Sequence, residues 1–393
     1  MVLQRVGLLL VLVTCVAEGQ LNEGAVQVHG FFTQGYAITN QNNYLTMNTS
    51  QGTFQMTDGG LNLSWKINPK LRVGVQVYDR YIGELGKGQA TLDWALVDYH
   101  FRDWLGFRAG KVKTPLGLFT DSQDQEFLYT WALLPQSVYP LDLRESNNAH
   151  VGGDLYGSVG LKRAGVLSYQ VYAGHVPSDY RNGFYYGLQD AGYRNVTYDV
   201  RTTGADLRWT TPVSGLMTGI SQGFGQRDSE GMLPGLPFVL KAKTYLDRTT
   251  AIYAEYSRGP WRLNGEWRAT KSSTEIFGLP PSFSRNGQTS HPWFAAASYR
   301  ISRRVEVGAY HGQYRFKSLF AVPGVADAGA GRIDDTTVTL RLDPTSYWNF
   351  KIEGHFINGF ANQLTARGFY LRNNPQGLQP TTNMLVLRTG INF

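Results

Sequence analysis

Basic side chains recur along this sequence at the spacing of alternating strands. In segments where apolar residues occupy every second position, the polar face carries more Lys and Arg than Asp and Glu. The basic positions are Lys66, Arg72, Arg80, Arg102, Arg108, Lys162, Arg208, Arg262, Arg268, Arg300, Arg341, Lys351 and Arg388. The acidic positions are Asp98, Asp206, Glu255, Glu266, Glu306 and Glu353.

These residue types could select ions if their faces lined one aqueous path. A cationic excess along a narrow path lowers the energy of anions and raises that of cations. The Arg guanidinium also offers a bidentate fork for carboxylate or phosphate oxygens. The alternative is that each cation pairs with a neighbouring acid and makes the wall rigid, as Arg262 and Arg268 could do with Glu266, and Lys351 with Glu353.

Motifs for catalysis are weak in this sequence. Gly219 to Gly223 matches the GxSxG pattern around Ser221, but a nucleophile elbow needs a helix after the serine, and no helical pattern follows. There is no HExxH or GxxxxGK[ST] motif, and the seven histidines have no ligand spacing. We expect no catalytic residue, metal or cofactor, and therefore no enzyme. The cations form no basic run, so we expect no nucleic-acid partner.

Composition indicates which elements position these cations. Charged residues make up 17% of the 393 residues, below the usual roughly 25%. Aromatic residues reach 13%, there are 45 glycines, and the net charge is +7. No segment after the first twenty or so residues has the ~20 consecutive apolar residues of a transmembrane helix. The composition is typical of a wall with lipid on one side and water on the other.

The N-terminal residues have the pattern of a secretory signal peptide. Arg5 precedes the short apolar core Val6 to Val13, and small residues follow at cleavage spacing. We therefore expect a signal peptide over residues 1–19 and a single barrel domain over residues 20–393. A lipid-modified Cys15 is the competing interpretation. Cys15 is the only cysteine of the sequence, so removal of the signal peptide would leave a mature chain without cysteine.

About sixteen alternating segments follow, joined in turn by short turns and long loops. The clearest are Val26–Ile38, a segment ending at Ile67, Leu71–Arg80, Ala90–Arg102 and Phe107–Lys111. Five tryptophans, which membrane interfaces favour, lie in or beside the short turns: Trp65, Trp104, Trp209, Trp261 and Trp348. The apolar faces carry almost no charge, as lipid requires. The pattern predicts an all-β, antiparallel, up-and-down transmembrane barrel with its short turns in the periplasm.

The last segment, Thr382 to Phe393, has the same alternation and ends on an aromatic residue. Leu385, Leu387 and Ile391 share one face, while Arg388 lies on the other. We expect it to be the closing strand of the barrel.

One connection, Val112 to Ala149, is far longer than the others and too apolar for a solvated loop. Long loops without strands are uncommon and usually functional. We expect this loop to fold into the barrel and form a constriction. Its charged residues would then face the basic wall: Asp121, Asp124, Glu126, Asp142, Arg144 and Glu145. The alternative is a packing loop at a subunit interface.

The stretches FRAGKVKTPLGLF, LLPQSVYP and GGDLYG within residues 92–160, the opening VHGFFTQGYAIT and the terminal Phe resemble bacterial porins of the phosphate-selective O/P family. The resemblance implies a sixteen-stranded, usually trimeric outer-membrane channel with the third long loop inside. It also implies an arginine ladder and a lysine cluster for phosphate, which no residue-by-residue match places here.

Together these observations predict a channel in the bacterial outer membrane for passive diffusion of small hydrophilic solutes, with a preference for anions. The expected partners are outer-membrane lipid, the solutes and two further copies in a homotrimer. The alternatives are a non-channel barrel for surface recognition or as a sheath for a partner, or a barrel lipase.

Overall fold

The computed structural model describes residues 26–280, 284–318, 331–360 and 367–393. The expected signal peptide, with Cys15, lies outside these ranges. Most of the Gly/Ala-rich stretch at 324–331 lies outside them as well.

The described chain is built mainly from strands. Their bounds are β1 (Val26–Thr39), β2 (Thr53–Asn68), β3 (Leu71–Ile82), β4 (Thr91–Arg102), β5 (Leu105–Lys113), β6 (Ala149–Gly160), β7 (Val166–Val176), β8 (Arg194–Thr210), β9 (Leu216–Met232), β10 (Leu240–Arg258), β11 (Trp261–Phe277), β12 (Arg285–Ser290), β13 (Trp293–Ser302), β14 (Val305–Ser318), β15 (Arg332–Leu342), β16 (Trp348–Asn358) and β17 (Thr381–Asn392). The α-helices are α2 (Arg144–Asn147) and α3 (Gly183–Asp190). Short 3-10 turns cover Thr49–Gln51, Thr120–Ser122, Glu126–Leu128, Leu141–Leu143, Lys162–Ala164 and Leu371–Asn373.

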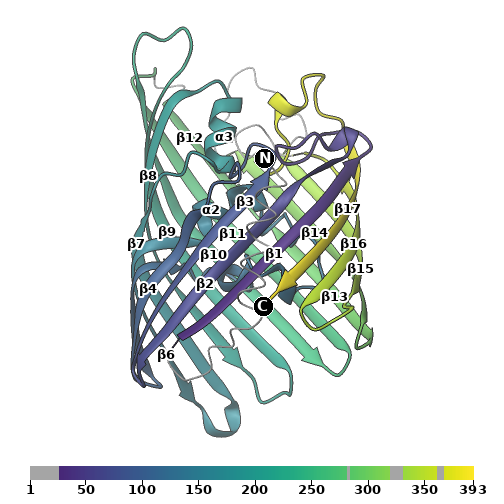
Figure 1. The fold of residues 1–393 in the computed structure, drawn as a ribbon. Coiled ribbons are helices and arrows are strands. Elements are labelled where there is room, and N and C mark those ends of the chain that lie inside the picture. The colour runs from purple at the N-terminus through teal and green to yellow at the C-terminus, as the bar shows by residue number, and fades with distance from the viewer. Residues whose placement is uncertain (1–25, 281–283, 319–330, 361–366) are drawn as a thin grey trace.

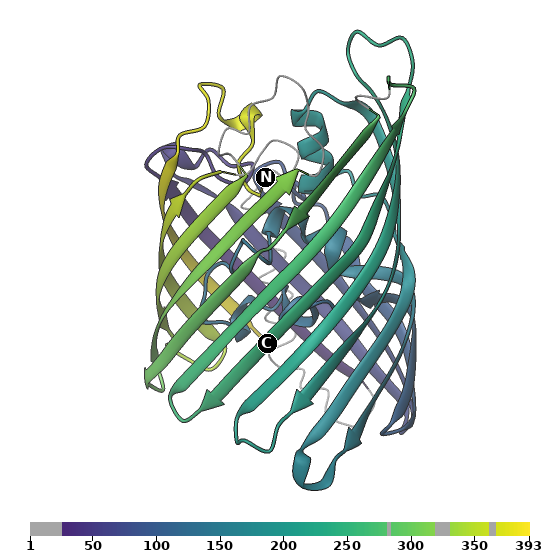
Figure 2. The same ribbon diagram turned by 180° about the vertical axis from the view of Figure 1, so that it is seen from behind.

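The strands form one antiparallel sheet that closes on itself where β1 pairs with β17 (Figures 1 and 2). Segments β12 and β13 both lie between β11 and β14, so they are two parts of one wall strand. The break falls at His291 and Pro292, because proline has no N–H to donate to a neighbour. The seventeen segments therefore make sixteen wall strands, and the predicted barrel is confirmed.

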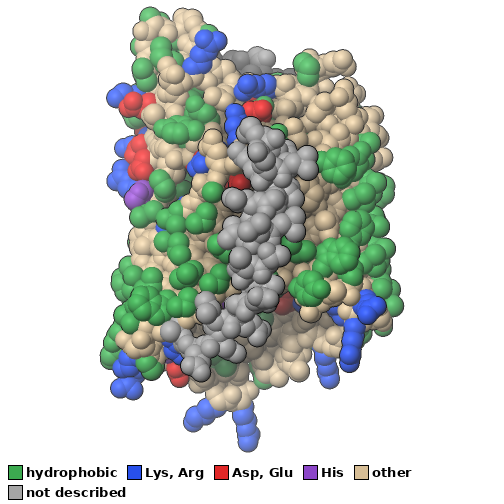
Figure 3. All heavy atoms as spheres, viewed as in Figure 1, with side chains coloured by type: hydrophobic (Ala, Val, Ile, Leu, Met, Phe, Trp, Pro, Cys, Tyr) green, Lys and Arg blue, Asp and Glu red, His purple; other side chains and the backbone are tan. Residues whose placement is uncertain are grey.

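The two faces of the wall follow the alternation of the sequence. In β2, the outward side chains Leu61, Leu63, Trp65 and Ile67 are 41–47% exposed. The tryptophans expected beside the short turns are all exposed, at 40–52%. Amphipathic rings at this level are typical of a membrane interface. Figure 3 shows apolar side chains over the body of one face and charged ones mainly near its rims.

The wall is uneven in height. Strand β5 has 9 residues, whereas β8, β9, β10 and β11 have 17, 17, 19 and 17. Toward the long-loop ends of these strands, the outward face becomes charged, with ion pairs between Arg201 and Asp228 and between Lys241 and Glu230. The tall strands therefore extend past the apolar band.

Residues 114–148, here called the inward loop, leave the top of β5 and run inside the barrel before β6 begins (Figure 2). The strand ends predicted from alternation differ from those of the structure by one or two residues, because β5 extends to Lys113 and β17 begins at Thr381. None of the helices in the described ranges has the length and apolar character needed to cross a membrane.

Candidate functional site

The inward loop is held against β16 by a buried lysine. The Lys351 side chain has no exposed surface, and its ammonium donates to the carbonyl oxygens of Glu126 and Trp131, both at 2.9 Å. It also forms an ion pair with the Glu126 carboxylate. A buried lysine needs such partners because burial disfavours its charge. Lys351 therefore supports the loop instead of facing open water.

Two arginines, one on each of the strands that flank β16, hold the same stretch of the loop. Arg388 of β17 donates to the carbonyl oxygen of Ala132 at 2.7 Å and to Asp58 of β2 at 2.6 Å. Arg341 of β15 donates to the carbonyl oxygens of Phe127 and Tyr129 at 2.9 and 2.7 Å. Alternation predicted that Arg341 and Arg388 would face an open lumen. Backbone carbonyl oxygens of the loop accept their hydrogen bonds instead.

Glu353 of β16 completes this attachment from the other direction. Its carboxylate accepts hydrogen bonds from the backbone N–H groups of Ala132 and Leu133, both at 2.8 Å. The buried His355 lies beside it, with Nε2 at 3.1 Å from Glu353 and Nδ1 at 3.0 Å from Asp335. The sequence had suggested Lys351 as the partner of Glu353. The loop supplies acceptors for the lysine, and Glu353 binds loop backbone and His355 instead.

Another part of the wall, at β11, binds the first turn of the loop. Glu266 of β11 accepts a hydrogen bond from the N–H of Leu118 at 2.9 Å and from the Tyr139 hydroxyl. Arg268 pairs with Glu266, as expected from the sequence, and donates to the carbonyl oxygen of Leu116 at 2.9 Å. Arg262 does not join this pair; it donates to the carbonyl oxygen of Leu128 at 3.3 Å.

Ser221, the serine of the GxSxG match, is another attachment point. It is fully buried, donates to Asp206 at 2.6 Å and accepts from the N–H of Gly117 at 2.9 Å. No histidine is among its described contacts. It lies within β9 and is followed by more strand, so the elbow geometry is absent here.

The two ends of the loop meet at a buried group of charges beside β3, β4 and β5. Arg144 donates to Asp93 at 2.9 Å, and Lys113 bridges Asp93 and Asp124 at 2.9 and 2.8 Å. Arg80 donates to the carbonyl oxygen of Leu141 at 2.6 Å and pairs with Glu145. Both ends of the loop are therefore fixed by ion pairs.

The loop's own charged residues thus point mostly at the wall. Asp124, Glu126, Asp142 and Arg144 are buried. Burial raises the pKa of Asp142, while the Tyr370 hydroxyl and the Gly368 N–H, which donate to it at 2.8 and 2.9 Å, oppose this shift. Asp121, the more exposed acid, pairs with Arg208 at 3.0 Å.

A second set of cations lies near the short-turn ends of the strands. Five arginines of this set come from five different strands and keep part of their surface in water: Arg72, Arg108, Arg208, Arg262 and Arg300. Their acidic partners include Asp98, at 2.9 Å from Arg72, and Asp154, at 3.6 Å from Arg108. Glu255 is a partly exposed acid in the same half of the barrel.

The remaining candidates lie apart from both sets. Arg102 ends β4 beside the ring of Phe101, with its guanidinium 5.8 Å from the ring centroid. Lys162 lies in the exposed 3-10 turn between β6 and β7. The alternation of the sequence predicted that both side chains would face the lumen. In the structure, Arg102 is the last residue of its strand and Lys162 lies in a turn.

Loops close over the long-loop end of the lumen. A buried apolar cluster, here called the mouth cluster, joins side chains from five loops and from the strand ends beside them. It includes Tyr44, Leu45, Met47, Leu85, Leu133, Tyr186, Phe369 and Tyr370. The sequence analysis missed this cluster, because its residues are scattered in loops and share no period.

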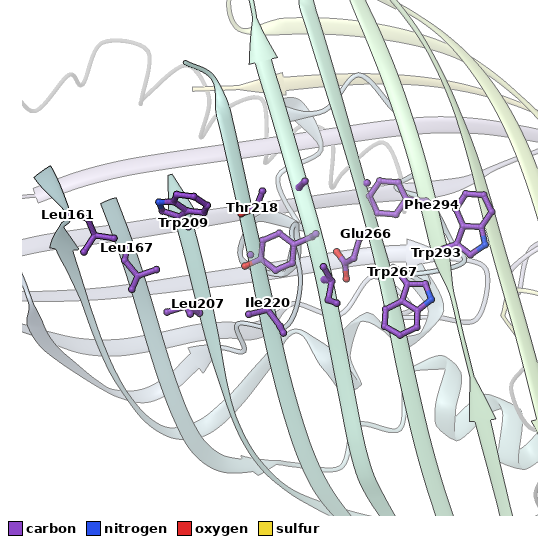
Figure 4. Close-up of a pocket in the computed structure, with 15 residues that line it drawn as sticks. Leu161, Leu167, Leu207, Trp209, Thr218, Ile220, Glu266, Trp267, Trp293 and Phe294 are labelled. Atoms are coloured by element: carbon purple, nitrogen blue, oxygen red, sulfur yellow. The ribbon is translucent and has the colours of Figure 1, made fainter. Parts of the chain in front are cut away.

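A groove of about 1060 Å³ lies on the outer wall over β7 to β13. Leu207, Ile220, Ile252 and Trp267 border it and are 40–51% exposed (Figure 4). These are outward positions of the alternation, so the groove belongs to the lipid-facing surface and not to the lumen. Within the described ranges, no group of three or more His, Cys, Asp or Glu side chains is arranged to hold a metal ion.

Comparisons with known proteins support the architecture. No family model matches the sequence, and no curated relative does. Solved outer-membrane proteins share the fold at 9–11% sequence identity. The outer membrane channel DcaP of Acinetobacter baumannii has a TM-score of 0.58 and 9% identity, covering 94% of this chain and 97% of its own.

Two further structures are similar. The anion-selective porin from Comamonas acidovorans has a TM-score of 0.53 and 11% identity, covering 94% of this chain and 100% of its own. OmpT of Vibrio cholerae has a TM-score of 0.56 and 10% identity, covering 95% and 99%. With the closed wall and its apolar outer band, they place this chain among the β-barrels of the bacterial outer membrane.

Proposed function

We propose that this protein is an outer-membrane channel through which small hydrophilic solutes diffuse passively, with a preference for anions. The orientation follows from the barrel layout, with short turns in the periplasm and long loops outside. The observation that carries the proposal is the set of water-exposed arginines in the periplasmic half of the lumen.

The exposure of each ion-pair partner decides the sign of the preference. The Arg72 side chain is 48% exposed, while its partner Asp98 is 10% exposed. Arg300 is 41% exposed, and its partner Glu306 is 6% exposed. The cationic ends therefore project toward the water and the carboxylates lie behind them. A dissolved ion meets the arginines first, and low-dielectric walls focus their field.

The buried cations contribute differently. Lys351, Arg341 and Arg388 are enclosed by the loop and the wall, where carbonyl oxygens and acids surround them. We propose that they set the position of the loop and thereby the width of the path. The proposal includes no chemical reaction, because Ser221 serves as a loop contact.

The resemblance in the sequence and the solved neighbours extend the proposal. Phosphate is the anion to test first, because arginine binds its oxygens in a fork. We also propose a homotrimer; one of the similar structures is a trimer form of the Vibrio cholerae protein.

The test is single-channel conductance in a planar bilayer with a salt gradient across it. We expect a steady open pore whose reversal potential has the sign of anion preference. A cation-selective pore would refute the anion preference and point to Glu255 and the loop acids.

A second candidate rests on the mouth cluster. Side chains from five loops pack across the extracellular end, which favours a barrel that is closed until a partner or solute displaces them. Folded protein that never conducts, but conducts after the loop over residues 367–380 is shortened, would support this candidate.

A further inference from the structure

A cavity of about 520 Å³ lies on the extracellular rim, between α3, the start of β8 and the loop that joins β16 to β17. Its lining includes Arg194, Arg372, Tyr185, Tyr193, Gln189 and Asn195, and it contains no acidic residue. Binding sites for small molecules commonly occupy ~300–1,000 Å³. The cavity is thus large enough for a ring that carries an anionic group.

The backbone of Arg372 is held by α3, and its guanidinium lies over an aromatic ring. The Asp190 carboxylate, at the end of α3, accepts hydrogen bonds from the backbone N–H groups of Leu371 and Arg372 at 3.0 and 2.7 Å. The Arg372 guanidinium lies 5.2 Å from the centroid of the Tyr186 ring. Tyr186 is itself fixed by a hydrogen bond from its hydroxyl to Asn373 at 3.0 Å. Asp190 is therefore occupied by backbone, which leaves the guanidinium available to a ligand.

Arg194 reaches the cavity because of a bulge. The pairing of β8 with β9 shifts register between Arg194 and Thr197, and Asn195 has a left-handed backbone with φ of 51°. A bulge re-aims the side chains next to it. Among the residues that the structure describes, neither Arg194 nor Arg372 forms an ion pair.

A neighbouring cavity of about 250 Å³ shows the contrast. It shares Gln189 and Arg372 with the first, but its other cations are already paired. Lys87 lies 2.9 Å from Glu84, and Arg181 lies 3.0 Å from Asp179. The larger cavity is where two arginines lack an acidic partner.

We propose that this larger cavity binds a small solute that carries both a carboxylate or phosphate group and a flat ring. The two arginines would bind the anionic oxygens, since arginine forms strong charge-assisted pairs with them. The rings of Tyr185 and Tyr193 would contact the flat body of the solute, and Gln189 and Asn195 offer hydrogen bonds to its polar substituents. The inference deepens the proposed function, because it places a capture site for anionic solutes at the outer mouth.

The test measures benzoate binding to the folded protein in detergent by isothermal titration and by saturation-transfer NMR. Variants are Arg194→Gln/Arg372→Gln and, as a matched control, Arg285→Gln. Arg285 is an exposed arginine of the extracellular hairpins that does not line the cavity. Inorganic phosphate serves as the competitor, and resistance of each variant to heat in SDS reports folding.

We expect the double variant to bind benzoate at least tenfold more weakly, the control to bind like the natural protein, and phosphate to displace benzoate. Unchanged binding by a folded double variant, or no binding by the natural protein, would overturn the inference. A misfolded double variant would be replaced by Arg372→Lys, which keeps the charge and should lose less affinity than Arg372→Gln. The bilayer experiment is separate: anion-selective conduction without benzoate binding refutes this site alone, and binding without anion selectivity refutes the proposed anion preference alone.

Discussion

The two sets of cations inside this barrel differ in what surrounds them. Lys351, Arg341 and Arg388 are buried, and loop carbonyls and acids occupy their donors. Arg72 and Arg300 are 48% and 41% exposed, with their carboxylates behind them. Both sets come from the same alternation in the sequence. The difference teaches that counting basic residues on the inward face overstates the charge offered to a passing ion, and under the proposed function the cations whose donors face water would contribute most to selectivity.

The largest expected effect is at Lys351, whose removal tests whether the buried cations hold the loop in place. We expect Lys351→Met to lower the free energy of unfolding by about 3–5 kcal/mol, because Glu126 then stays buried without its cation. Urea unfolding in detergent micelles measures this change. Lys66→Met, at an exposed lysine, is the control and should change stability little.

A double variant sharpens the same point. Lys351→Met/Glu126→Gln removes both charges and should recover part of the loss. If Lys351→Met alone is as stable as the natural protein, the buried set does not hold the loop.

Ser221→Ala tests the attachment on the other wall. It leaves the Gly117 N–H without its acceptor and removes one of the two hydroxyls that donate to Asp206 Oδ1, the other being that of Tyr253, which should cost about 1–3 kcal/mol. The same unfolding measurement applies, with Ser158→Ala at the short-turn rim as the control. A loss of esterase activity in this variant would contradict the structural role and revive the lipase alternative.

The exposed set is tested by Arg72→Gln/Arg262→Gln/Arg300→Gln. A unit charge ~4 Å away changes the energy of an ion in water by about 1 kcal/mol, so we expect a severalfold fall in the ratio of anion to cation permeability. The reversal potential in a salt gradient measures it. Arg163→Gln, in the periplasmic turn, is the control. An unchanged ratio would mean that the exposed arginines do not set selectivity.

The smallest effect concerns pH. Burial raises the pKa of Asp142, so the folded protein holds this proton at pH values where the unfolded chain has released it. The resulting stability is present below the usual Asp pKa of ~3.9 and is lost as pH rises through the higher folded pKa. Asp142→Asn should flatten this fall in stability above pH 4. Hydrogen exchange of the Gly368 N–H across that range measures it, and an unchanged pH slope would contradict the assignment.

The wall of the barrel could be predicted from the sequence, because the alternation of polar and apolar side chains is visible within each strand segment on its own. The exposed Leu61, Leu63 and Trp65 follow directly from alternation. The inward loop was also predictable, since its apolar residues had to be buried somewhere. The interruption of a wall strand at Pro292 was not anticipated.

The division of the cations could not be predicted, because it depends on partners distant in sequence. Lys351 has Glu353 two residues away, yet it pairs with Glu126 from the loop. Arg341 is satisfied by the carbonyl oxygens of Phe127 and Tyr129, groups that every residue carries and no sequence pattern marks. The rim cavity could not be predicted for the same reason, since Arg194 begins β8 and Arg372 lies in the loop between β16 and β17.

The seam between β1 and β17 has a consequence for assembly. Neighbours elsewhere in the wall are joined by a turn or loop and can pair as soon as both exist, whereas this seam joins the first strand to the last. Until β17 arrives, the sheet has two open edges, and unpaired edges invite other chains. Gly30 and Phe393 then exchange backbone hydrogen bonds at 3.0 and 2.9 Å across the seam. The sheet is therefore exposed to aggregation through almost all of its formation and becomes protected in a single final step.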